Sequence, residues 1–178
     1  PRVAVLSTGD ELVAVDAQPG AGQIRDVNGY ALAAAGEQAG GEVVRLGIAP
    51  DRLEAVVARL QQAAAAGVDL ILTSAGVSVG AYDVVKEALT ANGELTFWRV
   101  NMRPGKPLAF GRFGQVPVLG LPGNPVSALV GMEVFVRPVL LRLAGARQWE
   151  RPVITAALAE AFESDGRETY LRVALEAG

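Results

Sequence analysis

The chain has 178 residues, 51% of them apolar, with a formal net charge of −3 and neither Cys nor His. Without Cys or His it has no serine–histidine catalysis, zinc finger or disulfide scaffold, so any metal it binds must be held by oxygens, as Mg²⁺ is. The mild acidity argues against nucleic acid or anionic membranes as partners. No apolar run approaches the roughly 18 to 20 residues of a membrane span, and no signal peptide is recognisable, so a soluble, cytoplasmic protein is expected.

Strands and helices are expected to alternate along the chain. In order, the predicted elements are a strand at 2–7, a helix at 28–39, a strand at 42–48, a helix from about 51 to 67, a strand at 69–73, a helix at 83–91, strands at 95–101, 108–112 and 116–119, and a helix from 124 to about 145. Asn28 and Asn124 are the expected N-caps, and the last helix is expected to break near Pro138 and to bury Leu129.

Apolar strands that alternate with helices predict a three-layer α/β domain with a mostly parallel sheet over residues 1–147. Two further strands, at 153–158 and 169–175, are expected to form a ribbon around a turn at Asp165. Because a ribbon is marginal alone, residues 148–178 are expected to be a linker and the truncated start of a β-rich domain.

Four loops follow predicted strands, at 8–11, 74–82, 102–107 and 121–127, and the carboxyl ends of parallel strands are where ligands bind. The loop at 74–82 is rich in small residues and enters a helix, which is typical of an anion site but equally of a tight turn. The phosphate-loop motif and the dinucleotide-binding glycine motif are both absent, which excludes ordinary ATPases and Rossmann enzymes.

The loop at 102–107 carries Arg103 and Lys106 in a stretch without acidic residues, which suits a tetrahedral oxyanion, although a solvated basic turn is the alternative. The start of the last helix is a second candidate anion site to which Ser127 offers a hydroxyl, although helix capping alone also explains this turn. Asp10, Asp26 and Asp83 are candidates for Mg²⁺ or polar substrate groups, and each is alternatively a cap or a loop anchor. Phosphoryl or nucleotide chemistry with Mg²⁺ is therefore indicated.

Taken together, these motifs resemble the MoeA/gephyrin E-domain family of molybdopterin molybdenumtransferases. The matching strings are Ser7 to Leu12, Asp26 to Asn28, Thr73 to Gly80 with Asp83, Arg103 to Pro107, and Leu121 to Ser127. The resemblance implies that molybdate is inserted into adenylylated molybdopterin with release of AMP, assisted by Mg²⁺, in a homodimer with further domains. The alternatives are a non-catalytic scaffold module of the gephyrin type and a molybdopterin adenylyltransferase of the same fold.

The resemblance also implies roles for individual residues. Asp83 would be the essential acid beside Mg²⁺, and Arg103, Lys106 and Ser127 would hold molybdate, with help from an arginine of the following domain, for which Arg172 is the candidate. The expected pterin and nucleotide contacts are Thr8, Gly9, Asp10, Glu11, Asp26, Asn28, Ser74, Gly76, Val77, Ser78, Gly80, Pro104, Gly105, Pro122, Gly123 and Asn124. The chain departs from the family pattern at Ala75, where glycine is usual, and at Ala81, where an acid is common.

Overall fold

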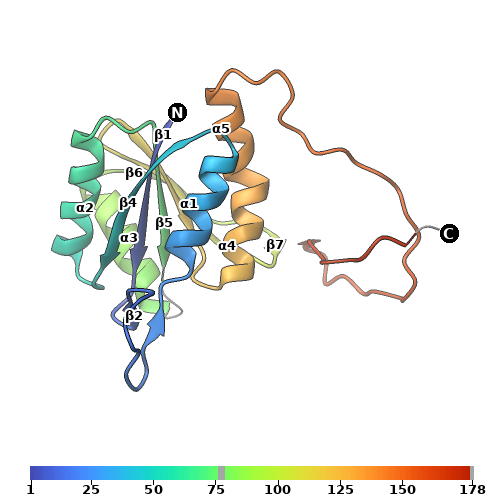
Figure 1. Ribbon diagram of the computed structural model, residues 1–178, viewed down its shortest axis with the longest axis horizontal. Coiled ribbons are helices and arrows are strands. Elements are labelled where there is room, and N and C mark those ends of the chain that lie inside the picture. Colours follow the sequence, from blue (N-terminus) through green and yellow to red (C-terminus); the bar gives the residue numbers. More distant parts are fainter. Residues whose placement is uncertain (76–78, 177–178) are drawn as a thin grey trace.

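A six-stranded sheet lies at the centre of the fold, in the order β4-β1-β5-β9-β8-β6 (Figure 1). The computed structural model describes residues 1–75 and 79–176, with the backbone alone described at 75, 79–83, 97 and 98. The strands are β1 (Arg2–Thr8), β4 (Glu42–Ala49), β5 (Leu70–Ala75), β6 (Gly93–Arg99), β8 (Pro107–Phe113) and β9 (Val116–Leu121). β8 alone runs in the direction opposite to the other five strands of this sheet, so the predicted mostly parallel sheet is confirmed.

Helices cover both faces of this sheet, as expected for apolar strands buried on two sides (Figure 1). They are α1 (Asn28–Gln38), α2 (Leu53–Ala65), α3 (Val79–Asn92), α4 (Pro125–Gly131), the π-helical turn η1 (Met132–Val136) and α5 (Arg137–Leu143). Leu60 of α2 and Leu89 of α3 pack on one face with Leu6, whereas Leu32 of α1 and Leu140 of α5 belong to the core on the other face. The three-layer architecture is therefore confirmed.

The last helix begins as predicted and then departs from a regular α-helix. The Asn124 side chain accepts a hydrogen bond from the Ser127 backbone N–H, and Pro125 occupies the first turn. The expected break near Pro138 takes the form of η1, because proline has no N–H to continue the α-helical pattern. Leu129 is 45% exposed, so its predicted burial is wrong.

Two other helix starts differ from the prediction. The N-cap of α1 is Val27, which is in a helical conformation and donates no side-chain cap, so Asn28 is not the cap. Helix α2 begins at Leu53, and its N-cap Arg52 also lacks a side-chain cap, so the Asp51 carboxylate is not used in this way. The Asn28 side chain is taken up by tertiary hydrogen bonds, described below, whereas the buried Asp51 Oδ1 has no hydrogen-bond partner.

Short strands lie outside the main sheet. β2 (Leu12–Val13) pairs with β3 (Ile24–Arg25) in an arm that follows β1, and β7 (Met102–Arg103) pairs with β10 (Glu168–Thr169). The predicted ribbon of 153–158 with 169–175 is not formed: Val153 is 92% exposed and Val173 is 65% exposed, so these side chains have no apolar surface to pack against. The turn at Asp165 is present, with Gly166 at a φ of +84°.

Among the described residues no helix combines the length and apolar character that crossing a bilayer requires.

Candidate functional site

The carboxyl ends of β1, β5 and β9 meet the first turns of α1 and α4 around a pocket of about 120 Å³. Five of the predicted site residues line it, namely Asp26, Asn28, Ser74, Gly123 and Asn124. The β2–β3 arm, with the apolar Leu12 and Ile24 and the charged Arg25, completes the wall together with Val27 and Pro125. Apolar walls with a few placed polar groups are the usual make-up of a small-molecule site.

Asn28 connects α1 to the ends of β5 and β9 beneath the pocket. Its Nδ2 donates to the Ser74 Oγ at 2.8 Å and to the backbone carbonyl of Gly123 at 2.7 Å. The residue is 8% exposed, so both hydrogen bonds are shielded from water. These contacts, rather than capping, explain why an amide stands at the start of α1, and they fix the loops after β5 and β9 relative to α1.

Asp26 performs the capping that had been expected of Asn28. Its Oδ1 accepts from the Ser7 hydroxyl at 2.8 Å and from the Gly29 backbone N–H at 2.9 Å, and the residue is 3% exposed. A Cβ at Gly29 would lie 2.4 Å from the Asp26 Oδ2, so only glycine leaves room for this carboxylate. The carboxylate beneath the pocket is thus held from two elements of the fold.

A second cluster of polar residues lies at the carboxyl ends of β1 and β4. The Asp51 backbone N–H donates to the Asp10 Oδ1 at 3.1 Å, and Glu11 folds back over Gly9. Two buried oxygens here lack a hydrogen-bond partner, the Thr8 Oγ1 and the Asp51 Oδ1. Asp51 is a candidate site residue that the sequence analysis did not single out, since it was placed only at the start of the helix predicted from about 51.

Asp51→Asn is expected to raise the melting temperature at neutral pH by about 1 to 3 °C. Burial raises the pKa of the Asp51 carboxyl, with smaller contributions from the Asp10 and Glu11 charges. A raised folded-state pKa makes the charged form a cost to stability above that pKa, and the cost vanishes as the pH falls towards 3. Thermal unfolding at pH 7 and pH 3 measures this, with exposed Asp16→Asn as the control; an equal gain at both pH values would contradict the assignment.

The predicted cationic loop lies beside the first turn of α4. A Cβ at Gly105, whose φ is +104°, would be 3.7 Å from the Ser127 carbonyl oxygen, so loop and helix are in contact. Arg103 and Lys106 are exposed, while Ser127 is 8% exposed and its Oγ lies 3.4 Å from the Asn124 Oδ1. The structure therefore places the backbone of the loop that carries both predicted cations beside the helix turn that carries the predicted hydroxyl.

Other residues predicted to contact the ligand lie on or next to the same loops. Pro104 is half-buried and Pro122 is buried at the end of β9. Arg167 was missed by the sequence interpretation: it shares the carboxylate of Asp165 with Arg103, as described below. Arg172, the predicted arginine that would help to hold molybdate, is exposed in a groove beside α4.

Part of the prediction falls where the structure gives no side chains. Gly76, Val77 and Ser78 lie outside the described residues, and Gly80 and Asp83 are placed only as backbone within α3. That helix begins four residues before the predicted start at Asp83. No residue other than glycine has a positive φ in the described chain, so Ala75 fits where the family pattern has glycine. Within the same residues no three acidic side chains are grouped as metal ligands.

Comparison with known proteins gives these loops a family context. Residues 4–142 match the model of a family described as "probable molybdopterin binding domain". A molybdopterin molybdenumtransferase of Haemophilus influenzae is 44% identical over 158 residues, which cover 89% of this chain and 39% of that protein. Gephyrin of Dictyostelium discoideum is 34% identical over 211 aligned residues, covering 99% of this chain and 29% of its own length.

The fold comparison agrees with the sequence comparison. A crystal structure described as the molybdopterin biosynthesis MoeA protein of Pyrococcus horikoshii superposes with a TM-score of 0.76 at 36% identity, covering 83% of this chain and 36% of that one. The chain therefore spans less than half the length of these relatives.

Proposed function

Since this chain belongs to the molybdopterin-binding domain family, in its MoeA/gephyrin branch, we propose that it is the substrate-binding domain of a molybdopterin molybdenumtransferase. The reaction is the insertion of molybdate into adenylylated molybdopterin with release of AMP. Residues 1–147 form the pterin-binding unit and residues 148–178 begin a second, β-rich domain. The full protein is a cytoplasmic homodimer that acts on small molecules.

The observation that carries this proposal is the shared first turn of α4. Asn124 lines the pocket, and Ser127, one helical turn along, contacts the loop of Arg103 and Lys106. A planar ligand in the pocket and a tetrahedral oxyanion on the loop would thus be held by the same helix end. The donors present are amides, hydroxyls and two cations, which suit molybdate, while the sulfur of the product comes from the pterin substrate.

Mg²⁺ fits the acidic residues at the ends of β1 and β4. The unpartnered, buried Oδ1 of Asp51 and the neighbouring Asp10 are hard oxygen donors of the kind that this ion prefers, and Asp83 would complete the set from α3. When bound, Mg²⁺ supplies positive charge to the pyrophosphate linkage of the substrate. The residues of this chain bind and orient that linkage beside the pocket.

Lys106→Ala is expected to weaken molybdate binding by about 10- to 100-fold, because a charge-assisted hydrogen bond contributes about 1.5 to 3 kcal/mol. Isothermal titration calorimetry on the full chain measures the affinity. Lys86→Ala is the matched control, since Lys86 is an exposed lysine of α3. Equal affinities of the wild type and Lys106→Ala would contradict the role of the loop. A protein that binds neither molybdate nor AMP would instead favour the gephyrin-type scaffold role.

A further inference from the structure

The C-terminal segment returns to the cationic loop as an added strand. β10 pairs with β7, and the Tyr170 backbone N–H donates to the Arg103 carbonyl at 2.8 Å while the Glu168 N–H donates to the Asn101 carbonyl at 3.2 Å. Backbone hydrogen bonds of this kind fix the register of the two segments. The turn just before β10 is therefore delivered to a defined place beside the Arg103 guanidinium.

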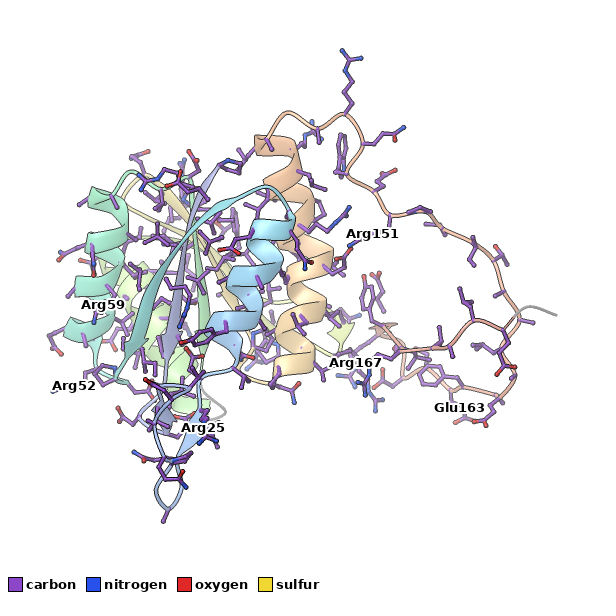
Figure 2. The ribbon with its side chains drawn as sticks, viewed as in Figure 1. Arg25, Arg52, Arg59, Arg151, Glu163 and Arg167 are labelled. Carbon is purple, nitrogen blue, oxygen red and sulfur yellow. The ribbon has the colours of Figure 1, made fainter. Side chains whose placement is uncertain are left out.

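That turn presents a carboxylate to two guanidinium groups. The Asp165 Oδ1 accepts from the Arg167 Nε at 3.0 Å and from its backbone N–H at 3.3 Å, and the Asp165 Oδ2 lies 3.7 Å from the Arg103 Nη1. The Ser164 hydroxyl closes the turn by donating to the Arg167 carbonyl at 3.1 Å. Figure 2 shows Arg167 on the part of the tail that faces the body of the protein.

Like an oxyanion, the Asp165 carboxylate presents negatively charged oxygen to the Arg103 guanidinium. A guanidinium group attracts a carboxylate and a tetrahedral oxyanion alike. The single Oδ2–Nη1 pair at 3.7 Å places the Asp165 charge beside Arg103, so an oxyanion that binds Arg103 must compete with that charge. The side chains of Arg103 and Asp165 are 57% and 41% exposed, so water screens the pair and an exchange of partners costs little. The hydrogen bonds from Arg167 hold the pKa of Asp165 down at about 2, and the competing charge is present throughout the physiological range.

We infer that Asp165 is an internal competitor for the oxyanion site, a carboxylate that occupies Arg103 until molybdate displaces it. This inference rests on the proposed function, because it assigns the same loop to molybdate. A dianion replaces the single negative charge of Asp165 with a gain in charge, whereas a monoanion such as nitrate does not. Competition from Asp165 thus lowers the affinity of the site for singly charged oxyanions more than its affinity for doubly charged ones.

Asp165→Asn tests the inference in the full chain, with molybdate titrated into the protein by isothermal titration calorimetry. Because an exposed ion pair is a weak competitor, the variant is expected to bind molybdate about two- to fivefold more tightly than the wild type. The gain is expected to be constant between about pH 5 and 9, since Asp165 stays ionised there. Glu163→Gln is the matched control, because it removes the same charge from the bend of the tail that lies away from the body (Figure 2).

The outcomes separate the inference from the proposed function. If Arg103→Ala weakens molybdate binding and Asp165→Asn does not strengthen it, the competitor role is wrong and the proposed function stands. A gain of equal size in Glu163→Gln would also overturn the role, since it would reflect net charge alone. If neither the wild type nor Asp165→Asn binds molybdate, the proposed function and the inference both fail.

Discussion

Gly29→Ala is expected to lower the free energy of unfolding by about 2 to 3 kcal/mol and to abolish binding in the pocket. The new Cβ would lie 2.4 Å from the Asp26 Oδ2 and 3.0 Å from the Ser7 Oγ. Asp26 cannot move aside without losing the hydrogen bonds from Ser7 and from the Gly29 N–H, and at 3% exposure no water replaces them. Urea denaturation and AMP titration measure the two losses.

A double-mutant cycle identifies the cause of the Gly29→Ala effect. If the clash with the carboxylate is responsible, Asp26→Ala combined with Gly29→Ala costs about as much as Asp26→Ala alone. Additive losses would mean that the alanine disturbs α1 for another reason. The exposed Ala34→Gly in the same helix is the control for backbone effects, with an expected cost of about 0.5 to 1 kcal/mol.

Local sequence signals predicted those features whose cause is local. The buried strand β1 follows from an unbroken apolar run, and the start of α4 follows from Asn124 and Pro125, which meet their partners within three residues. Such contacts are encoded by neighbours in the chain, so composition and spacing suffice to place them. The meeting of loops at one edge then follows from the rule that the carboxyl ends of parallel strands share one edge of the sheet.

The predictions that were wrong concern residues whose contacts lie far away in the sequence. Asn28 has the residue type of an N-cap, but its partners Ser74 and Gly123 lie 46 and 95 residues away. Asp51 looked like a helix-start acid, yet its neighbour Asp10 is 41 residues away. No local pattern distinguishes a polar residue that caps its own helix from one used by a distant loop.

Asn28→Leu is expected to destabilise the fold by about 3 kcal/mol and to weaken ligand binding in the pocket by at least about tenfold. Leucine has the same branched side-chain skeleton, so no cavity is left while the Ser74 Oγ and the Gly123 carbonyl both lose their donor. A buried acceptor left without a partner costs about 1 to 3 kcal/mol. The loops after β5 and β9 would lose the group that holds them at α1, so Asn124 would no longer be fixed at the pocket wall.

Ser74→Ala separates the two hydrogen bonds, because Asn28 keeps its bond to Gly123 in that variant. Its expected cost is about 1 kcal/mol, and its ligand affinity should fall less than that of Asn28→Leu. Urea denaturation with AMP titration of both variants gives the comparison. A Ser74→Ala variant as damaged as Asn28→Leu would place the essential contact at Ser74 itself, whereas the larger loss in Asn28→Leu identifies the carbonyl of Gly123 as the point through which α1 positions the β9 loop.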